Sequence, residues 1–414
     1  MATRVVVPMV AFVLALLTLP MLTAVAASAT TDRARATLTS AQAAARLDAA
    51  LPAFYRPPAQ LATAAPGTLI RSEPYPAIKG ARAWKVLYHS RSIDGRDIAV
   101  SGVVVAPTSG AVPAGGRPVV SWAHGTHGIA DKCAPSRHDD WVKRMPAIRA
   151  LIDQGNVVVA TDYEGLGTPG VHPYLIGESG GRGVLDIARA AHDIPQAKAS
   201  SRVIAYGHSQ GGQAALFAGE IAPDYAPDLD LLGVVAGAPA AEIEAMLPAA
   251  ASIPQTLGFV VLGLEGARAV YPQVDLSKVL TPPALAKSDK VVGSECYEDV
   301  LAAFRQPVDQ VIAQNPSDVA PFPELMAQNT AGRRPTAAPV FVFQGLGDDV
   351  VYKVFTDMYV KASCATGNDV LYKTFSGIDH YEEVKSSEAD VVAWITAREA
   401  GEPAAGNCAT APLS

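Results

Sequence analysis

The chain has 414 residues, of which 49% are hydrophobic, 18% charged and 7% aromatic. This composition excludes a disordered or fibrous protein, because it supplies ample apolar material for a core and shows no compositional period. Lys and Arg number 33 against 40 Asp and Glu, which gives a formal charge of −7, and no basic run occurs. Nucleic acid is therefore not expected as a partner. The length suits two domains or one large domain that carries an insertion.

The N-terminus is typical of a secretory signal peptide, which we place at residues 1–29. A positively charged start precedes an uncharged apolar run over residues 5–26, and small residues follow. Cleavage is expected after Ala26 or Ala29. The run is long enough to span a bilayer, so an uncleaved anchor is the alternative, but two prolines within it argue for removal. We expect a secreted protein, extracellular or in the cell envelope, with no stable membrane insertion once the signal is removed.

Export makes the four cysteines candidates for two disulfides, with three possible pairings. They lie far apart and form no C-x-x-C pair, so zinc binding and thioredoxin-like redox chemistry are poorly supported. These residues are Cys133, Cys296, Cys364 and Cys408.

Residues 30–83 form an N-terminal segment rich in Ala, Pro and Thr, which we expect to wrap over the surface with at most a short helix before Ile78. Regular periodicity begins at Trp84. Over residues 84–239, apolar or alternating strands are separated by helical stretches, which predicts crossover units and a mostly parallel sheet. The predicted strands are 86–90, 97–106, 118–123, 156–161, 202–206 and 231–236, and the predicted helices are 141–154, 183–192 and 213–221.

The alternation fails over residues 240–335, which are rich in Pro, Ala and Leu. We predict that this stretch is an inserted, largely helical cap. The alternation resumes in residues 336–414, which complete the core and end in a tail. The fold class expected is therefore α/β, with a mostly parallel central sheet, flanking helices and a cap. The later elements are strands at 339–343 and 370–375 and helices at 354–363 and 382–397.

The pentapeptide GHSQG at residues 207–211 lies between a predicted strand and a predicted helix. In this context the pattern Gly-x-Ser-x-Gly is typical of the nucleophile elbow of the α/β-hydrolase fold, where a strained turn exposes the serine hydroxyl. A second match at residues 177–181 follows a Pro/Gly loop instead of a strand. We therefore interpret Ser179 as a cap for the helix expected from Gly183, and Ser209 as the nucleophile.

A serine nucleophile needs a base that an acid holds in the right tautomer, and in this fold the order along the chain is Ser, acid, His. His380 is the only one of eight histidines after Ser209, and it follows a predicted strand. The acid is expected after the preceding strand, where Asp348 and Asp349 are adjacent. Sequence alone separates them weakly; we take Asp348 as the acid and the other as a helix cap. Asp379 neighbours the histidine and is not expected to align the same imidazole.

The strand that ends at Ala123 leads into HGTHG at residues 124–128. The fold places one oxyanion donor in this loop, and the backbone N–H of Gln210, directly after the nucleophile, is the other. Thr126 and His127 are equal candidates for the first donor. No metal or organic cofactor is expected. A metal site is a weak alternative, because the spacing of its candidate ligands fits no known pattern; these are His124, His127, His138, Asp139 and Asp140.

Together, these motifs resemble the secreted lipase family of the α/β-hydrolase fold, typified by Candida antarctica lipase A. The matching pieces lie in order between residues 84 and 400, and as a set they are far more specific than any one alone. They are SWAHGT at 121–126, CAPS at 133–136, TDYEGLG at 161–167, the elbow at Ser209, DDVV at 348–351, Tyr359 to Lys361 with Cys364, and His380.

The resemblance implies a hydrolase of lipids or other carboxylic esters with a triad of Ser209, Asp348 and His380. It implies a cap between the sixth strand and the acid loop. It also implies one disulfide between Cys133 and Cys296, from the oxyanion loop to the cap, and another between Cys364 and Cys408, which pins the C-terminal tail. The chain departs from the family pattern at two positions, with Tyr352 where the acid loop often has Pro and His127 where Thr is common.

We expect Ser209 to attack an ester carbonyl, His380 to carry its proton to the departing alcohol, and Asp348 to stabilise the imidazolium. A lipid or other ester, such as a triacylglycerol at a lipid–water interface, is the expected partner. The apolar stretch 245–264 is either the core of the cap or an acyl-chain pocket. The alternatives are an acyltransferase with the same acyl-enzyme, a peptidase, and a catalytically inactive exported binding protein of the same fold.

Overall fold

The computed structural model describes residues 51–413. The predicted signal peptide and the start of the N-terminal segment, residues 1–50, lie outside the described residues. No helix within residues 51–413 is both long and apolar enough to cross a membrane.

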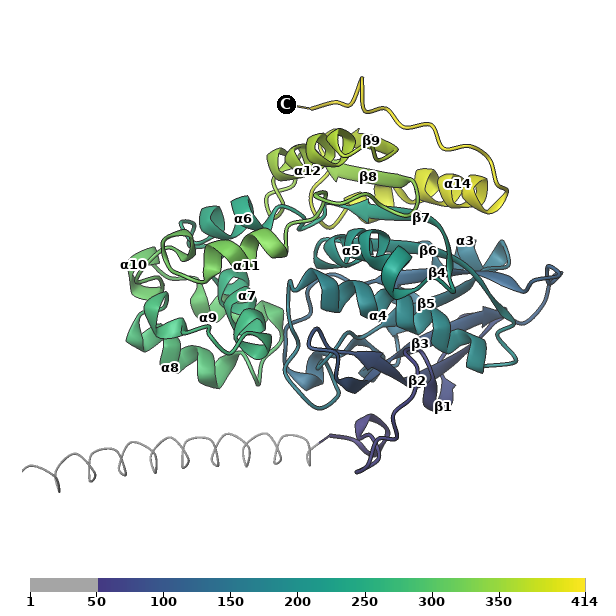
Figure 1. Ribbon diagram of the computed structural model, residues 1–414, viewed down its shortest axis with the longest axis horizontal. Helices are drawn as coiled ribbons and strands as arrows, with labels where there is room; N and C mark the ends of the chain where they lie inside the picture. The colour runs from purple at the N-terminus through teal and green to yellow at the C-terminus, as the bar shows by residue number, and fades with distance from the viewer. Residues whose placement is uncertain (1–50, 414) are drawn as a thin grey trace, which may run out of the picture. The chain divides into compact units, whose positions relative to one another are not determined.

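A nine-stranded mixed sheet forms the centre of the described chain (Figure 1). Its order is β1-β2-β3-β5-β4-β6-β7-β8-β9, and the last six strands in this order run parallel to one another. Each predicted strand is present, and the α/β fold class is confirmed. The bounds are β1 Leu69–Tyr75, β2 Ala81–Arg91, β3 Asp97–Pro107, β4 Arg117–Ala123, β5 Val157–Thr161, β6 Ala199–His208, β7 Asp230–Gly237, β8 Val340–Gly345 and β9 Val370–Phe375.

Strand β1 lies in the segment where we expected at most a short helix, so that expectation was wrong. It pairs antiparallel with β2 at the edge of the sheet. Its middle residues, Ser72 to Pro74, are exposed, and a polar, proline-containing edge strand lacks the apolar alternation that marks a strand in sequence. Upstream of it, the side chains of Leu51, Phe54 and Tyr55 pack on Leu87 of β2.

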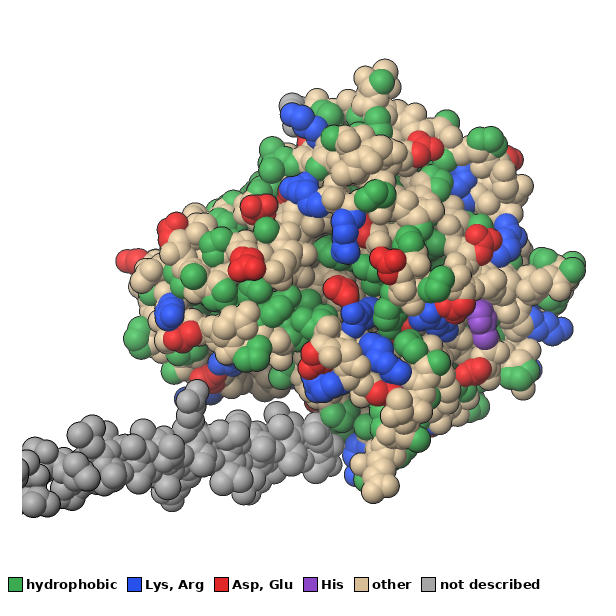
Figure 2. All heavy atoms as spheres, in the orientation of Figure 1, with side chains coloured by type: hydrophobic (Ala, Val, Ile, Leu, Met, Phe, Trp, Pro, Cys, Tyr) green, Lys and Arg blue, Asp and Glu red, His purple; other side chains and the backbone are tan. Residues whose placement is uncertain are grey.

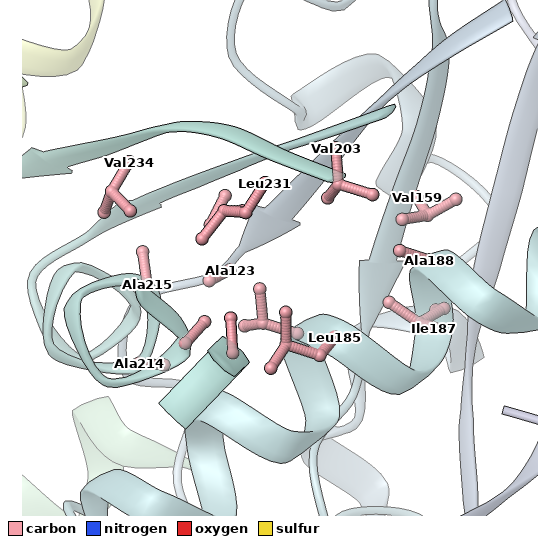
Figure 3. Packing of buried hydrophobic residues seen from close by; sticks show 14 of the residues in the cluster. Ala123, Val159, Leu185, Ile187, Ala188, Val203, Ala214, Ala215, Leu231 and Val234 are labelled. Atoms are coloured by element: carbon pink, nitrogen blue, oxygen red, sulfur yellow. The ribbon is translucent and has the colours of Figure 1, made fainter. Parts of the chain in front are cut away.

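Helices cover both faces of the sheet. On one face, α4, α5 and α12 pack on the strands. Figure 3 shows Ile187 and Ala188 of α4 beside the strand residue Val159. On the other face, α2, α3 and α14 enclose a second apolar cluster. These helices are α2 Trp141–Arg144, α3 Ile148–Asp153, α4 Gly177–Ala190, α5 Gln210–Tyr225, α12 Lys353–Ala365 and α14 Glu388–Glu399.

Two predicted helices are divided in the structure, and a third begins well before its expected start. The helix expected over 141–154 is two helices, because Pro146 and the positive φ of 52° at Ala147 interrupt it. The helix expected over 382–397 is likewise divided, into α13 Glu383–Ser386 and α14. Helix α4 begins at Gly177, six residues before the expected start.

The named elements between β7 and β8 are all helices, joined by turns and loops, and these residues have a hydrophobic cluster of their own. Much of the apolar stretch 245–264 belongs to this cluster, since Leu257, Val261 and Leu264 are fully buried in it. Figure 1 shows these helices together, apart from the helices that flank the sheet. They are α6 Ile243–Ala250, α7 Leu257–Val270, α8 Pro282–Val291, α9 Tyr297–Phe304, α10 Val308–Val311 and α11 Phe322–Gln328.

Two disulfides tie this architecture together with the pairing that the family resemblance implied. Cys133, in the loop after β4, is bonded to Cys296 at the start of α9. Cys364 of α12 is bonded to Cys408 in the C-terminal segment. Native disulfides of this kind typically contribute about 2–4 kcal/mol to the free energy of unfolding.

Candidate active site

Ser209 lies at a sharp turn between the end of β6 and the start of α5. Its backbone has φ 59° and ψ −120°, a conformation that residues other than glycine rarely adopt. The turn depends on the two glycines of the pentapeptide. A Cβ on Gly207 would lie 2.0 Å from the carbonyl oxygen of Gly211, and a Cβ on Gly211 would lie 1.9 Å from that of Ala123. The sequence therefore builds the strained strand-to-helix turn that the Gly-x-Ser-x-Gly pattern predicts.

His380 and Asp348 lie in neighbouring loops, after β9 and β8 respectively, and both side chains are buried. His380 Nδ1 is 2.7 Å from Asp348 Oδ2. The other carboxylate oxygen, Oδ1, accepts hydrogen bonds of 2.8 Å from the N–H groups of Val350 and Val351. Gln344 Nε2 also donates to Asp348 Oδ2 at 3.0 Å. The carboxylate is thus fixed from three directions and presents one oxygen to the imidazole.

The two alternative acids lie elsewhere. Asp349, adjacent to Asp348, is exposed to solvent. Asp379 is also exposed, and its Oδ1 accepts the N–H groups of Tyr381 and Glu382 at 2.9 Å. Asp348 is therefore the carboxylate bound to His380, and it also accepts the backbone N–H bonds that we had expected its neighbour to accept as a cap.

The structure brings Ser209 and His380 into the wall of one cavity, together with both candidate residues of the oxyanion loop. The nucleophile turn, the histidine loop, α7 and α9 all contribute to this wall. The lining residues are Gly125, Thr126, His127, His208, Ser209, Phe259, Tyr297, Val350, His380 and Tyr381.

The loop after β4 is held by the rings of His124 and His127, whose Nδ1 atoms lie 2.7 Å and 2.9 Å from the carbonyl oxygen of Gly125. Burial lowers the pKa of both histidines, so both rings are neutral and donate through Nδ1. A Cβ on Gly125 would lie 3.7 Å from Ser209 Cβ, which shows how closely this loop passes Ser209. Thr126 Oγ1 is 2.7 Å from the hydroxyl of Tyr174 and fixes the other side of the loop.

The structure does not bring three or more side chains of the metal-site alternative close enough to share an ion. Within residues 51–413, the one group of three or more potential ligands with atoms close enough to share an ion is His208, His380 and Glu383. Asp140 instead pairs with Arg144, four residues along the chain.

A mostly apolar cavity also begins at Ser209 and extends beneath α6 and α7. It holds about 730 Å³ of space not filled by atoms, part of it open to solvent. A second cavity shares Tyr174, Leu175, Ile243 and Leu247 with the first and continues toward α11. The first is lined by Thr126, Tyr174, Leu175, Ser209, Ala240, Ile243, Met246, Leu247, Ala249, Ala250, Ile253, Thr256, Phe259, Val260, Val350, Val351, Tyr352 and Phe355.

A family model described as Secretory lipase matches residues 143–407, more than half of the chain. The chain belongs to the Secretory lipase family. The solved structure of Candida antarctica lipase A superimposes with a TM-score of 0.76 at 21% sequence identity and covers 88% of this chain and 89% of that one. This likeness shows the fold, which is a lipase A-like α/β-hydrolase.

The relatives of this Secretory lipase family member include proteins named as an esterase and as a probable inactive lipase. Trichothecene C-3 esterase of Fusarium sporotrichioides is 28% identical over 264 residues, which are 59% of this chain but only 57% of the esterase. Probable inactive lipase MT1628 of Mycobacterium tuberculosis (strain CDC 1551 / Oshkosh) is 25% identical over 380 residues, 84% of this chain and 82% of the relative. Membership of the family therefore indicates a lipase or esterase scaffold.

Ser179, in the second Gly-x-Ser-x-Gly match of this Secretory lipase chain, is not a helix cap. It lies inside the first turn of α4, which begins at Gly177, and no side chain caps that helix start. Its hydroxyl donates a 2.6 Å hydrogen bond to Glu164 Oε2. The interpretation as a cap was wrong because the helix starts earlier than the Gly-rich sequence suggested. The pattern here lies on a regular helix, without a strained turn.

Sequence reasoning missed two buried pairs beside the site. His172 Nε2 is 2.8 Å from Gln210 Nε2, and its Nδ1 is 2.9 Å from the carbonyl oxygen of Glu164. Burial lowers the pKa of His172 to about 4, so the neutral ring accepts from the amide of Gln210 and donates to the carbonyl. The second pair is His208 and Glu383. Nothing in the sequence connects residues that lie 175 positions apart.

Proposed function

We propose that this chain is a secreted serine hydrolase of carboxylic esters, and specifically a lipase that acts on triacylglycerols or other lipid esters through an acyl-enzyme. One observation carries the proposal. A serine on a strained strand-to-helix turn and a histidine hydrogen-bonded to a buried aspartate line the same cavity, and an apolar pocket opens from that serine.

In the acylation step, Ser209 Oγ attacks the ester carbonyl carbon while His380 Nε2 takes the hydroxyl proton. Nε2 is free to do so because Nδ1 carries its proton toward Asp348 Oδ2. Asp348 stabilises the imidazolium that forms and keeps its own charge. His380 then gives the proton to the departing alkoxide oxygen, so that an alcohol leaves and Ser209 remains acylated.

The negative charge on the tetrahedral intermediate needs N–H donors, and the loop geometry favours Thr126 over His127. Both imidazoles bond to the carbonyl of Gly125, so this carbonyl points at the rings. The Gly125–Thr126 peptide is trans, since the cis bond recorded in the described chain is Ala320–Pro321, and the N–H of Thr126 therefore points the opposite way. Thr126 also lines both cavities at Ser209.

The N–H of Gln210 is the second donor that we assign. It lies in the first turn of α5, where backbone N–H groups have no acceptor within the helix. The contact of its side chain with His172 holds this residue in place. One donor of this type is typically worth about 2.7–4 kcal/mol of transition-state stabilisation.

Deacylation repeats the sequence with water. His380 removes a proton from a water molecule, the hydroxide attacks the acyl carbon, and the proton passes to Ser209 Oγ as the carboxylic acid leaves. Every atom in this cycle comes from the ester, water and the side chains of Ser209 and His380. We therefore assign no metal or organic cofactor to it.

The substrate class follows from the pocket. Helices α6 and α7 present almost exclusively apolar side chains to the cavity that opens from Ser209, and this suits an acyl chain more than a peptide or a sugar. The stretch 245–264 thus has both roles that we had considered, since one face is core and the other lines the pocket. We propose that residues 240–335 act as the cap over the acyl-binding site. Two disulfides support secretion.

The experiment that tests the proposal compares hydrolysis of a soluble ester by the wild type, Ser209→Ala and Ser179→Ala. We expect Ser209→Ala to reduce kcat by about 10⁴-fold or more, and Ser179→Ala to remain within about threefold of the wild type at an unchanged Tm. No hydrolysis by the folded wild type would favour an inactive binding protein, as the name of one relative suggests for that relative. Product formed mainly on an added alcohol acceptor would favour an acyltransferase.

A further inference from the structure

A second acid–histidine pair lies beside the candidate triad and takes no part in the mechanism above. His208 Nε2 is 2.8 Å from Glu383 Oε1, and Glu383 Oε2 accepts the N–H of Gly345 at 2.5 Å. Glu383 has no exposed surface, and His208 is buried as well. A carboxyl group buried this completely needs a specific reason to be there, because burial is unfavourable for its charged form.

The pair touches every loop that carries a triad residue. His208 directly precedes Ser209 at the end of β6. Gly345 ends β8 and begins the loop of Asp348. Glu383 begins α13, three residues after His380, and the rings of His208 and His380 lie 4.5 Å apart between centroids.

We propose that Glu383 and His208 are positioning residues that, as a neutral hydrogen-bonded pair, hold the histidine loop against the nucleophile turn and the acid loop. This inference rests on the proposed function, because it assigns these two residues a role in aligning His380 with Ser209. Neither residue is required to touch the ester.

The neutral form of the pair satisfies both contacts of Glu383. His208 faces Glu383 through Nε2, and burial keeps the ring of His208 neutral because it lowers its pKa. A neutral Glu383 donates from Oε1 to the lone pair at Nε2, and its Oε2 accepts the N–H of Gly345.

The surroundings favour the same protonation. Burial raises the pKa of Glu383 to about 9, and burial with the nearby His380 ring lowers the pKa of His208. Among the ion pairs described for residues 51–413, Glu383 has His208 as its sole partner. The titratable groups that interact electrostatically with Glu383 are His208, Asp348, Asp379, Tyr206 and Tyr372.

The same atoms are poorly arranged for a metal ion, although they lie close together with His380. Nε2 of His208 and Oε1 of Glu383 are 2.8 Å apart, a hydrogen-bond distance. Two tetrahedral zinc ligands at about 2.0–2.2 Å from the metal would be separated by roughly 3.3 Å or more. The pair would have to open before an ion could enter.

The test uses Glu383→Gln and Glu383→Ala in the full-length enzyme. A glutamine amide donates and accepts as a protonated carboxyl does, so Glu383→Gln should retain at least about a third of the wild-type kcat/KM at pH 7. Glu383→Ala removes both hydrogen bonds and should lower kcat by about 10²-fold while KM changes by less than about threefold, because the imidazole is displaced and the acyl pocket is intact.

The pH profile separates alignment from general stability. As wild-type Glu383 ionises near pH 9, it can no longer donate a hydrogen bond to Nε2 of His208, so kcat should fall through an apparent pKa near 9. Glu383→Gln cannot ionise, and its profile should stay flat through this range. Glu265→Ala is the matched control, since Glu265 is a buried carboxyl on α7 that bonds to Ser288. It should lower Tm and leave kcat within about threefold.

Three results would overturn the inference. These are a loss in Glu383→Gln as large as that in Glu383→Ala, alkaline profiles that coincide for wild type and Glu383→Gln, or a fully active Glu383→Ala. If Glu383→Ala does not fold, the pH profiles of kcat for the wild type and Glu383→Gln still test the inference, because they do not require that variant. Failure of the proposed function is distinct, since then the wild type would be inactive or would not depend on Ser209.

Discussion

At the scale of single residues, the adjacent pair Asp348 and Asp349 shows how burial and hydrogen bonding separate two carboxylates that are equivalent in sequence. Both follow β8 and both are carboxylates, so residue type does not separate them. Only Asp348 is buried, accepts two backbone N–H bonds and reaches the imidazole of His380. Adjacent side chains leave the backbone in different directions, one toward the buried site and one toward solvent. Residue type alone does not determine which is which.

We predict that Asp348→Asn lowers kcat for ester hydrolysis by about 10⁴-fold, as the loss of the carboxylate leaves the imidazole in the wrong tautomer and its cation unsupported. Asp349→Asn is the matched control and should stay within about threefold of the wild type, because that side chain is exposed. Steady-state kinetics on one soluble ester, with Tm measured for each variant, provide the comparison. Equal losses in the two variants would show that the wrong acid has been assigned.

Residue-level reasoning from sequence is most specific where chain order restricts the choice. His380 was predicted because no other histidine follows Ser209, and the structure places the two in one cavity. The hydrogen bond between Glu383 and His208 could not be predicted from sequence, because it depends on how three loops pack together. The Gly-rich sequence also gave no signal for the helix start at Gly177, so the interpretation of Ser179 as a helix cap was wrong.

At the scale of elements, strands were easier to predict than helix bounds. Buried parallel strands read as apolar runs that end at turns, and each predicted one is present. The helix over 141–154 was wrong in detail because a proline and a left-handed Ala147 divide it. Strand β1 was missed because an edge strand can be polar on its exposed positions.

Helices α6 and α7 determine the proposed acyl pocket, and Leu247 marks the boundary between its two cavities. We predict that Leu247→Trp lowers the ratio of kcat/KM for palmitate over butyrate esters by at least about tenfold, because an indole fills the junction and only short chains still fit. Leu285→Trp is the control, as Leu285 is equally half-buried in the same cluster but lines neither cavity.

Initial rates over a series of p-nitrophenyl esters would provide these ratios. A parallel loss for all chain lengths in Leu247→Trp would contradict an acyl site at this junction. A shift of equal size in Leu285→Trp would show that the change arises from general disturbance of the helical segment.

At the scale of the whole molecule, the sheet brings distant segments to one edge. Residues 209, 348 and 380 follow three different parallel strands, β6, β8 and β9, and the carboxyl ends of parallel strands lie on the same side of a sheet. The fold class and this convergence could be predicted, because they depend on strand order and periodicity. The packing of the helical segment against that edge could not, because it depends on contacts between distant side chains.

Charge is distributed in a way that agrees with an uncharged substrate. On the face of the described chain seen in Figure 2, Lys and Arg side chains lie interspersed with Asp and Glu. Many charged side chains of residues 51–413 form close pairs, such as Arg189 with Asp228 and Lys373 with Asp390. Specificity in this account therefore comes from the apolar pocket and the site at Ser209.

The most direct test of the central claim is covalent labelling with a fluorophosphonate, followed by mass spectrometry of the peptide that carries each adduct. The account predicts one adduct per folded chain, on Ser209 and not on Ser179, and no labelling of His380→Ala. A folded wild type that takes no label, or an adduct on any other serine, would contradict it.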